Sequence, residues 1–279
     1  MIKFAVYFRD RMKLAIYLKH ESLRSEKRLA PMLAELKDCE LYDVRSRDDL
    51  RPGTDMVLSV GGDGTFLTAA TMVAGTGVPV LGVNLGRLGF LSENRPEDVA
   101  QALLKGDYTI EDRDMLQSFL DGRDAGIALN EIAVTRCSSA MLGVGVTVDG
   151  QRLPTYWADG LLVSTSIGST AYSLSVGGPI CLPDTHVFII APIAPHNLNV
   201  RPLVVPSSAR IELELNSRDG AATFTRDNAH MQVDGSAKIS ISLAQFSLKR
   251  VRLAQSSFIG ALQQKLFWGE DVRNDENGR

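Results

Sequence analysis

The residues best suited to carry chemistry lie in one glycine-rich segment, Gly61-Gly-Asp-Gly-Thr65. An apolar run typical of a buried strand precedes it at residues 55–60, and apolar residues at helical spacing follow at 66–74. Glycines let consecutive backbone N–H groups face a ligand, and the start of a helix adds partial positive charge, so the segment predicts a cradle for phosphate. Asp63 is expected to act there as a general base or as a ligand of a divalent metal ion. A helix N-cap is the structural alternative for Asp63.

A second glycine-rich segment, residues 158–179, combines an apolar strand, a turn rich in hydroxyl groups and a glycine pair. Half of the 24 glycines fall within residues 61–89 and 160–178. Ser and Thr hydroxyls beside exposed N–H groups suit the recognition of sugar hydroxyls and base edges, and Tyr172 offers an aromatic face. The alternative is a Ser/Thr-rich turn that caps a helix.

Other nucleotide and hydrolase signatures are absent from the sequence. It contains no Walker P-loop, no G-x-G-x-x-G that opens a helix after a strand, and no G-x-S-x-G nucleophile elbow. The 4 histidines are dispersed, which argues against a Ser-His-Asp hydrolase. The 3 cysteines lie far apart, which argues against structural zinc and a disulfide scaffold and favours a reducing cytoplasm.

Composition narrows the class of partner. The 279 residues carry a formal net charge of −3, whereas nucleic-acid-binding proteins usually carry a basic excess. No apolar run approaches the roughly 20 residues that cross a bilayer, and the run at residues 2–8 is not followed by a signal-peptide cleavage site. We therefore expect a soluble cytoplasmic protein that binds neither nucleic acid nor membrane.

The pattern of elements predicts an α/β N-terminal domain followed by an all-β C-terminal domain and a last helix. In the first domain we expect strands at 2–8, 40–44, 55–60 and 78–83 and helices at 21–37, 66–74 and 96–105. In the second we expect strands at 128–135, 143–148, 160–165, 187–191, 210–215, 222–225, 238–243 and 246–253. Helical spacing returns at 256–268. The predicted domains are residues 1–112, 113–255 and 256–279.

Five groups of residues, in this order, carry a resemblance to a known family. They are Gly61-Gly-Asp-Gly-Thr65; Asn84-x-Gly-x-Leu-Gly-Phe-Leu91; Leu129-Asn-Glu131; Asp159-Gly160 with Gly168-Ser-Thr-Ala-Tyr-Ser-Leu-Ser175 and Gly177-Gly-Pro179; and Pro195-His-x-Leu-Asn-x-Arg-Pro-Leu203. Together they resemble the bacterial NAD kinase (ATP-NAD kinase) family over residues 55–268. Gly-Gly-Asp-Gly alone also occurs in relatives among diacylglycerol, sphingosine and phosphofructokinases.

The resemblance implies a fold and a reaction. The α/β domain would precede the β-rich domain, and the last helix would pack back on the first. ATP would transfer its terminal phosphoryl group to the 2′-hydroxyl of the adenosine ribose of NAD, giving NADP, so that the enzyme is a phosphotransferase with an alcohol acceptor. A divalent cation, normally magnesium, would neutralise the phosphates. A homodimer or homotetramer is implied.

The resemblance also assigns residues. Asp63 would be the catalytic proton acceptor. The cofactor-binding residues would be Asp63, Gly64, Asn130, Glu131, Asp159, Thr170, Ala171, Tyr172, Ser173, Leu174, Ser175 and Ala194. No residue is assigned to the metal ion.

Three positions differ from the family pattern. Ile167 stands where a hydroxyl is common, Trp157 where Arg or Lys is common, and Ser236 where Gln often follows Asp-Gly. Two other functions remain open on the residues alone. One is a lipid or small-polyol kinase that shares the Gly-Gly-Asp-Gly cradle, and the other is a catalytically weak NAD(P)-binding regulator.

Overall fold

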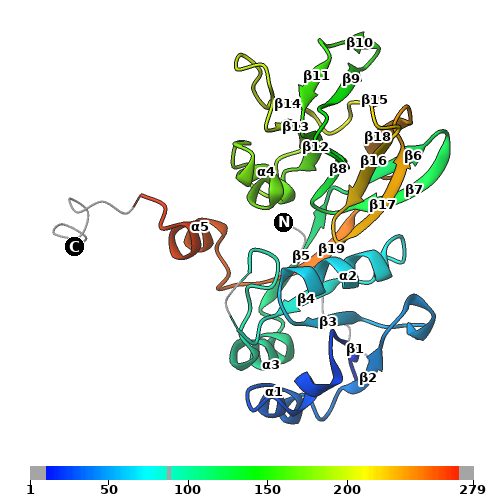
Figure 1. Cartoon of the computed structure of the whole chain (residues 1–279). Helices are drawn as coiled ribbons and strands as arrows, with labels where there is room; N and C mark the ends of the chain where they lie inside the picture. Colours follow the sequence, from blue (N-terminus) through cyan, green and yellow to red (C-terminus); the bar gives the residue numbers. More distant parts are fainter. Residues whose placement is uncertain (1–10, 87–88, 270–279) are drawn as a thin grey trace. The chain divides into compact units, whose positions relative to one another are not determined.

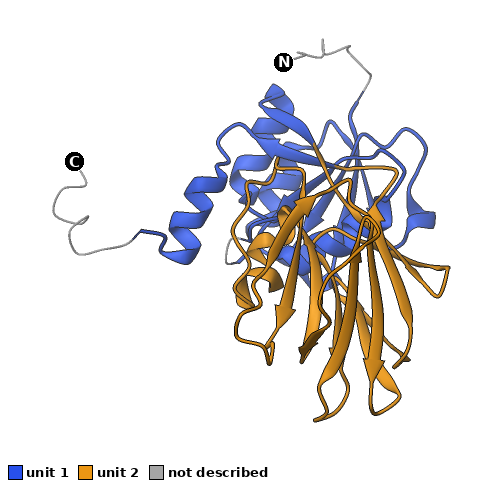
Figure 2. Cartoon of the chain, turned by 90° about the horizontal axis from the view of Figure 1, so that it is seen from above, with its two compact units in different colours: residues 1–111, 249–279 blue, residues 112–248 orange. Residues whose placement is uncertain are grey.

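The computed structural model describes residues 11–86 and 89–269. The chain forms two compact units, unit 1 from Met1–Glu111 with Lys249–Arg279 and unit 2 from Asp112–Leu248 (Figure 2). The predicted class, an α/β unit and an all-β unit with the last helix returning to the first, is confirmed. The strand expected at residues 2–8 lies outside the described residues.

Unit 1 is built on a sheet with strand order β2-β1-β3-β4-β19-β5 (Figure 1). Its strands are β1 (Lys13–Leu18), β2 (Glu40–Val44), β3 (Met56–Val60), β4 (Val80–Val83), β5 (Tyr108–Arg113) and β19 (Leu248–Leu253). β1 to β4 pair in parallel, and every residue of β3 and β4 is buried. Continuous apolar runs of this kind are typical of parallel strands that are covered on both faces.

The helices of unit 1 follow the local sequence signals. They are η1 (Glu21–Ser25), α1 (Leu29–Glu35), η2 (Arg47–Asp49), α2 (Asp63–Val73), α3 (Pro96–Lys105) and α5 (Phe258–Leu266). α3 has the predicted bounds, with Pro96 at its start and Gly106 at its end in the left-handed region at φ 71°. The helix expected at 21–37 is split, because Pro31 lacks an N–H and its ring would clash with the carbonyl of Lys27 in a continuous helix.

Unit 2 contains two antiparallel sheets, with orders β10-β9-β15-β18-β6-β7 and β14-β13-β12-β8-β16-β17, and β11 pairs with β9. Its elements are β6 (Leu116–Leu120), β7 (Arg123–Ala128), β8 (Glu131–Arg136), β9 (Leu142–Val148), β10 (Gln151–Arg152), β11 (Tyr156–Ala158), β12 (Gly160–Thr165), η3 (Ile167–Thr170), α4 (Tyr172–Ser175), β13 (Val187–Ile193), β14 (Leu203–Pro206), β15 (Ile211–Ser217), β16 (Ala221–Arg226), β17 (Ala229–Asp234) and β18 (Lys238–Leu243). Apolar side chains of both sheets form one buried cluster.

The central strand β12 positions the second glycine-rich segment. Leu161 and Val163 belong to the cluster shared by the two sheets, whereas Leu162 belongs to a separate cluster that includes Val176 and Cys181. The chain that follows β12 therefore folds back over the second face of its own sheet.

The last predicted strand, 246–253, occupies a different place from the one expected. It forms β19, which pairs in parallel with β4 in unit 1, with Arg250 opposite Val80. The β-rich texture of the preceding sequence suggested a second-domain strand, but strand propensity does not specify which sheet a strand joins. Val251 and Leu253 are instead buried in the core of unit 1. None of the described helices has the length and apolar character that a membrane crossing needs.

Candidate functional site

The strand-to-helix junction after β3 forms as the sequence predicts. Gly61 adopts a φ of 153°, and a side chain there would collide with Thr65. Gly62 is the N-cap of α2, and Asp63 is the first helical residue, earlier than the helix start expected at 66. The glycines thus let the chain turn tightly from a buried strand into a helix, and they leave Gly62 and Gly64 exposed at the N-terminus of that helix.

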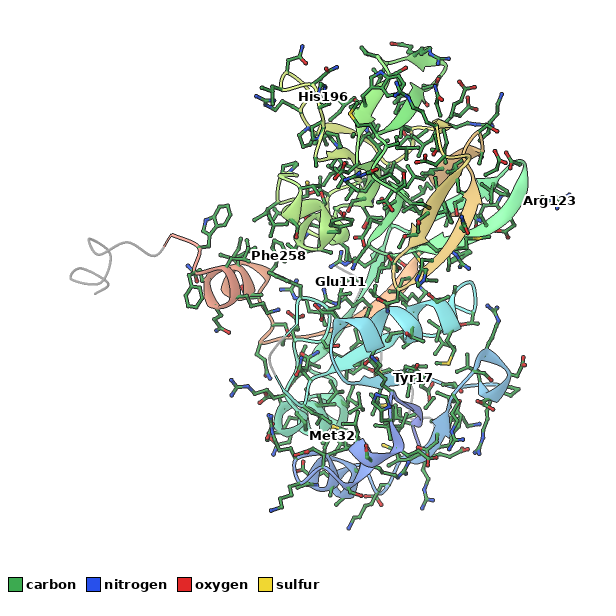
Figure 3. The ribbon with its side chains drawn as sticks, viewed as in Figure 1. Tyr17, Met32, Glu111, Arg123, His196 and Phe258 are labelled. Carbon is green, nitrogen blue, oxygen red and sulfur yellow. The ribbon has the colours of Figure 1, made fainter. Side chains whose placement is uncertain are left out.

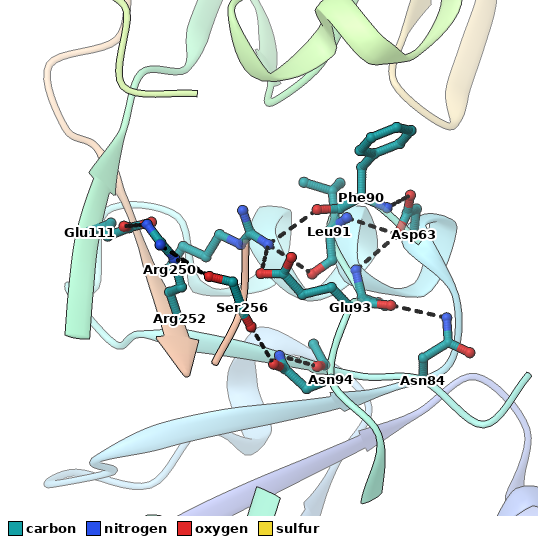
Figure 4. Close-up of polar contacts among 12 residues, drawn as sticks. Asp63, Asn84, Phe90, Leu91, Glu93, Asn94, Glu111, Arg250, Arg252 and Ser256 are labelled. Atoms are coloured by element: carbon teal, nitrogen blue, oxygen red, sulfur yellow. Dashed lines mark hydrogen bonds and ion pairs between the residues drawn. The ribbon is translucent and has the colours of Figure 1, made fainter. Parts of the chain in front are cut away.

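The carboxylate of Asp63 is held by a distant segment (Figure 4). The N–H of Phe90 donates to its Oδ2 at 2.8 Å, and the N–H groups of Leu91 and Ser92 donate to its Oδ1 at 3.0 and 2.8 Å. The N-cap of α2 is Gly62, which has no side chain that could cap the helix, so Asp63 does not serve as the N-cap. A carboxylate has about four acceptor sites. Three N–H donors therefore fix its orientation and leave one acceptor site on Oδ2.

The segment whose N–H groups bind the Asp63 carboxylate has a glycine where the carboxylate approaches. A Cβ on Gly89 would fall on the Asp63 carboxylate, so only glycine fits at this position. The buried Asn84 donates from Nδ2 to the carbonyl of Ser92 at 3.0 Å, and its Oδ1 accepts from the N–H of Gly86 at 2.7 Å. The Asn84 motif therefore anchors the same short segment that Asp63 holds.

Arg250 supports this segment from β19. Its Nη2 donates to Glu93 Oε1 at 2.7 Å and to the carbonyl of Phe90 at 3.1 Å. The side chains of Arg250 and Glu93 are only 6% and 12% exposed, so this ion pair is shielded from solvent. Figure 4 shows these contacts beside those of Asp63.

In unit 2, a second aspartate holds Asn130 and Glu131, which lie at the start of β8. The carboxylate of Asp227 accepts the N–H groups of Leu129, Asn130 and Glu131 at 2.7, 2.8 and 3.1 Å. Asp227 itself has a φ of 46° in the turn between β16 and β17. Sequence reasoning missed Asp227. Its Asp-Asn pair between two strand-like runs indicates a turn, but nothing local indicates a partner 97 residues away.

Glu131 is electrostatically unusual. It is 9% exposed, and the pKa of its carboxyl group is raised to about 8 by burial and by the negative charge of Asp227. A hydrogen bond from the N–H of Tyr172 lowers this pKa and so opposes part of the rise. Burial also raises the pKa of Asp227, while the three N–H bonds oppose that change. Oε2 of Glu131 has no hydrogen-bond partner among the described residues. At neutral pH the Glu131 carboxyl group is therefore mainly protonated and able to donate a hydrogen bond.

The second glycine-rich segment packs against Asn130. The N–H of Thr165 and the hydroxyl of Ser164 donate to the Asn130 carbonyl at 2.9 and 3.0 Å. A Cβ on Gly168 would collide with that same carbonyl. The structure thus brings together two motifs that lie about 35 residues apart in the sequence.

The remaining predicted residues of unit 2 have different environments. Tyr172 is 39% exposed, and its pKa is raised by burial and by the charges of Glu131 and Asp159. Ser173 is buried, and its hydroxyl has no partner among the described residues. Thr170, Ala171 and Leu174 are partly buried, and Ser175 is exposed.

Asp159 lies at the turn between β11 and β12. It forms an ion pair with Arg136 at 2.8 Å, and its N–H donates to the carbonyl of Ile193 at 3.0 Å. Ala194 follows Ile193 directly and adopts a φ of 44°. Asp159 and Ala194 are therefore neighbours across the β12–β13 pair.

The three residues that differ from the family pattern, Trp157, Ile167 and Ser236, have structural roles. The ring of Trp157 covers Gly143, where a Cβ would lie 2.9 Å from its Cζ3. Ile167 is 7% exposed and therefore part of the core. Ser236 donates from its N–H and hydroxyl to Asp234 at 2.8 and 2.6 Å, which closes the turn before β18.

Comparisons with known proteins identify the family. The ATP-NAD kinase N-terminal domain family matches residues 7–107, and the ATP-NAD kinase C-terminal domain family matches residues 129–253. An NAD kinase of Flavobacterium psychrophilum is 39% identical over 260 residues, covering 89% of this chain and 88% of the relative. An NAD kinase of Bacteroides fragilis is 40% identical over 261 residues, covering 91% and 87%.

Solved structures agree with this result. The crystal structure of an NAD kinase from Archaeoglobus fulgidus in complex with ATP matches with a TM-score of 0.75 at 29% identity, over 92% of this chain and 99% of that one. A yeast NADH kinase complexed with NADH shares the fold with a TM-score of 0.82 at 22% identity, over 95% and 90%.

Proposed function

Since the chain belongs to the NAD kinase family, we propose that it transfers the terminal phosphoryl group of ATP to the 2′-hydroxyl of the adenosine ribose of NAD and so makes NADP. One observation of the structure supports this function most directly. It is the Asp63 carboxylate, fixed by three N–H donors at the start of α2 and left with one acceptor site on Oδ2. The expectation that the chain is a phosphotransferase of this family agrees with its relatives.

In the proposed reaction, Asp63 Oδ2 accepts the proton of the 2′-hydroxyl. The hydroxyl oxygen then forms a bond to the terminal phosphorus of ATP, and the bond from that phosphorus to the bridging oxygen breaks, so that ADP leaves with the electron pair. The N–H groups of Gly62 and Gly64, together with the N-terminal end of α2, would bind phosphate oxygens. Positioning and charge stabilisation supply most of the catalysis in such transfers.

NAD is proposed to be bound by unit 2. The protonated Glu131 would donate to a ribose or phosphate oxygen, and the amide of Asn130 and the carboxylate of Asp159 would bind further hydroxyl or amino groups. Tyr172 would stack on a ring of the dinucleotide. The other proposed lining residues are Thr170, Ala171, Ser173, Leu174, Ser175 and Ala194.

Magnesium is proposed to enter as part of the ATP complex. Among the described residues, no group of three or more His, Cys, Asp or Glu side chains is arranged to hold a metal ion. Magnesium bound through nucleotide phosphates needs only one or two protein carboxylates and keeps several waters. In this arrangement the ion would neutralise phosphate charge, and the chain would position the nucleotide.

A cytoplasmic location and a homodimer or homotetramer complete the proposal. The described cysteines Cys39, Cys137 and Cys181 are all free thiols, which suits a reducing compartment. Light scattering during gel filtration would give the oligomeric state, and fractionation of cells with a specific antibody would give the location.

The function is tested by incubating the purified protein with ATP, magnesium and NAD and measuring NADP with an NADP-specific dehydrogenase. We expect NADP that accumulates with enzyme and time. Parallel reactions with NADH and with polyphosphate define the acceptor and donor range. If diacylglycerol or a polyol is phosphorylated while NAD is not, the proposed acceptor is wrong.

A further inference from the structure

The C-terminal helix α5 brings a lysine to the segment that Asp63 holds. Ser257 caps α5 by accepting the N–H of Gly260 at 3.2 Å. Phe258 packs against Phe90 with ring centroids 6.1 Å apart, and Figure 3 shows Phe258 on α5. From the last turn of the helix, Nζ of Lys265 lies 4.0 Å from the centroid of the same Phe90 ring. Phe90 is also a residue whose N–H binds Asp63.

The ammonium group of Lys265 lacks hydrogen-bond acceptors. Its Nζ is buried and makes no hydrogen bond with the described residues, although an ammonium group has three donors. Burial lowers the pKa of Lys265 to about 8, and Arg250 adds to this lowering, while the negative charges of Asp63 and Glu93 oppose it. The face of an aromatic ring replaces only part of the lost hydration. An unpaired cation of this kind weakens the fold unless a ligand supplies the missing acceptors.

We propose that Lys265 binds the terminal phosphate groups of the nucleotide donor and follows the phosphoryl group during transfer. The proposal rests on the proposed function. The ammonium stands over Phe90, next to the carboxylate that accepts the proton and near the N-terminus of α2. Phosphate oxygens supply acceptors for its three N–H donors and increase the local negative charge that keeps it protonated. Lys265 forms no covalent bond, and the proton of the acceptor hydroxyl still goes to Asp63.

A structural role for Lys265 predicts different behaviour from a phosphate-binding role. The pKa of Lys265 in the fold, about 8, lies below the ordinary value of 10.5. Between pH 8 and pH 10.5 the unfolded chain therefore binds more protons than the folded chain. The destabilisation caused by burying the charged Lys265 is fully present below pH 8. Removing the charge should raise the melting temperature at pH 7, whereas removing a structural contact should lower it.

The test compares Lys265→Met, which keeps an unbranched chain without charge, with Lys265→Arg, which keeps the charge. Lys105→Met, at an exposed position in the last turn of α3, is the matched control. For Lys265→Met at pH 7 we expect kcat/KM for ATP to fall by about 30-fold or more, since a charge-assisted phosphate contact is lost. Lys265→Arg should recover part of that loss, and Lys105→Met should resemble the wild type.

Binding of inorganic tripolyphosphate, measured by calorimetry, tests the same contact without turnover. We expect its affinity to fall by about tenfold in Lys265→Met, while NAD affinity stays unchanged and the melting temperature rises. Unchanged tripolyphosphate affinity would overturn the proposal, as would a lower melting temperature with an unchanged KM for ATP.

A third measurement remains if Lys265→Met does not fold. In the wild type the KM for ATP should rise above pH 8, where Lys265 loses its proton in a site that also contains Asp63, Glu93 and Arg250. Lys265→Arg should remove that rise, and a persistent rise would contradict the proposal. If the wild type makes no NADP but binds tripolyphosphate through Lys265, the proposed function fails and the phosphate contact stands.

Discussion

Two aspartates in different units use the same contact pattern for different purposes. Asp63 in unit 1 accepts three backbone N–H groups from residues 90–92, and Asp227 in unit 2 accepts three from residues 129–131. Asp63 lies at the start of a helix and keeps an acceptor site that the proposed proton transfer would use. Asp227 lies in a turn and fixes the backbone that carries Asn130 and Glu131. A carboxylate that accepts three N–H hydrogen bonds can therefore itself face a ligand, or it can fix the backbone of neighbouring residues that face the ligand. The surroundings of the carboxylate determine which.

The largest expected effect comes from Asp63→Asn. An amide cannot accept the proton of the acceptor hydroxyl, so we expect kcat to fall by about 100-fold or more. The NH2 group also cannot accept the N–H of Phe90, so the held segment loses one bond. NAD affinity should be largely kept, because Asn130 and Glu131 belong to unit 2. Turnover by NADP assay and NAD binding by calorimetry check both statements. Near wild-type turnover would remove Asp63 from the role of proton acceptor.

Gly89→Ala should disturb Asp63 without changing its chemistry. The new Cβ would occupy the position of the carboxylate and force it to move, so we expect kcat to fall by about tenfold or more because small displacements of reacting groups are costly. Gly86→Ala is the control. The Cβ that this substitution adds would have only Asn84 Oδ1 within 4 Å, at 3.9 Å, and so would not displace the carboxylate. The two variants should differ in kcat and agree in the KM for NAD. Equal kcat values would show that the position of the carboxylate is not limiting.

Asp227→Asn should act on NAD rather than on the chemical step. One of three N–H donors would lose its acceptor, which costs about 1–3 kcal/mol. The resulting shift of Asn130 and Glu131 should raise the KM for NAD by about tenfold with a smaller change in kcat. Asp149→Asn is a matched control, because Asp149 also has a positive φ of 48° and accepts a backbone N–H, that of Arg210 at 2.8 Å. A loss of stability in Asp227→Asn with an unchanged KM would reduce Asp227 to a structural role.

The same two aspartates show how far the sequence could be interpreted. Asp63 is predictable because the motif that carries it is local: a buried strand, three glycines and a helix start lie within about twenty residues. The N–H groups that fix its carboxylate come from residues 90–92, and the motif alone does not indicate them. Asp227 was missed because its meaning depends on residues 129–131, which only the folded sheet brings close. Alternation of strands and helices likewise predicted the α/β unit, and the series of short strand-like runs that follows predicted the all-β unit.

Two other outcomes depended on tertiary packing. β19 joins unit 1 although its pattern resembles that of the neighbouring strands of unit 2, because strand patterning does not specify the partner strand. Lys265 looks like an ordinary lysine in the last turn of a helix, and only the position of α5 places it over Phe90. Burial and charge of this kind arise from contacts between distant segments and carry no local signal.

The smallest expected effect comes from Glu131→Gln, and it sharpens the contrast between the units. The folded pKa of Glu131, about 8, lies above its ordinary 4.5, so the fold holds a proton that the unfolded chain has lost. The stability that this group contributes is fully present below pH 4.5 and is lost as pH rises through 8. Glutamine is neutral throughout, so the melting temperature of Glu131→Gln should rise relative to that of the wild type as the pH increases from 5 to 9.

Binding should follow the same titration. At pH 7 glutamine resembles the protonated acid in shape and in its ability to donate, so we expect the KM for NAD to change by only about two- to threefold. Above pH 8 the wild-type KM should rise as Glu131 ionises beside Asp227, while that of Glu131→Gln stays level. Melting curves and KM values across pH 5–9 check these expectations. Parallel pH profiles in the two proteins would mean that Glu131 is already ionised at neutral pH. The inference that Glu131 is protonated and donates a hydrogen bond would then be wrong.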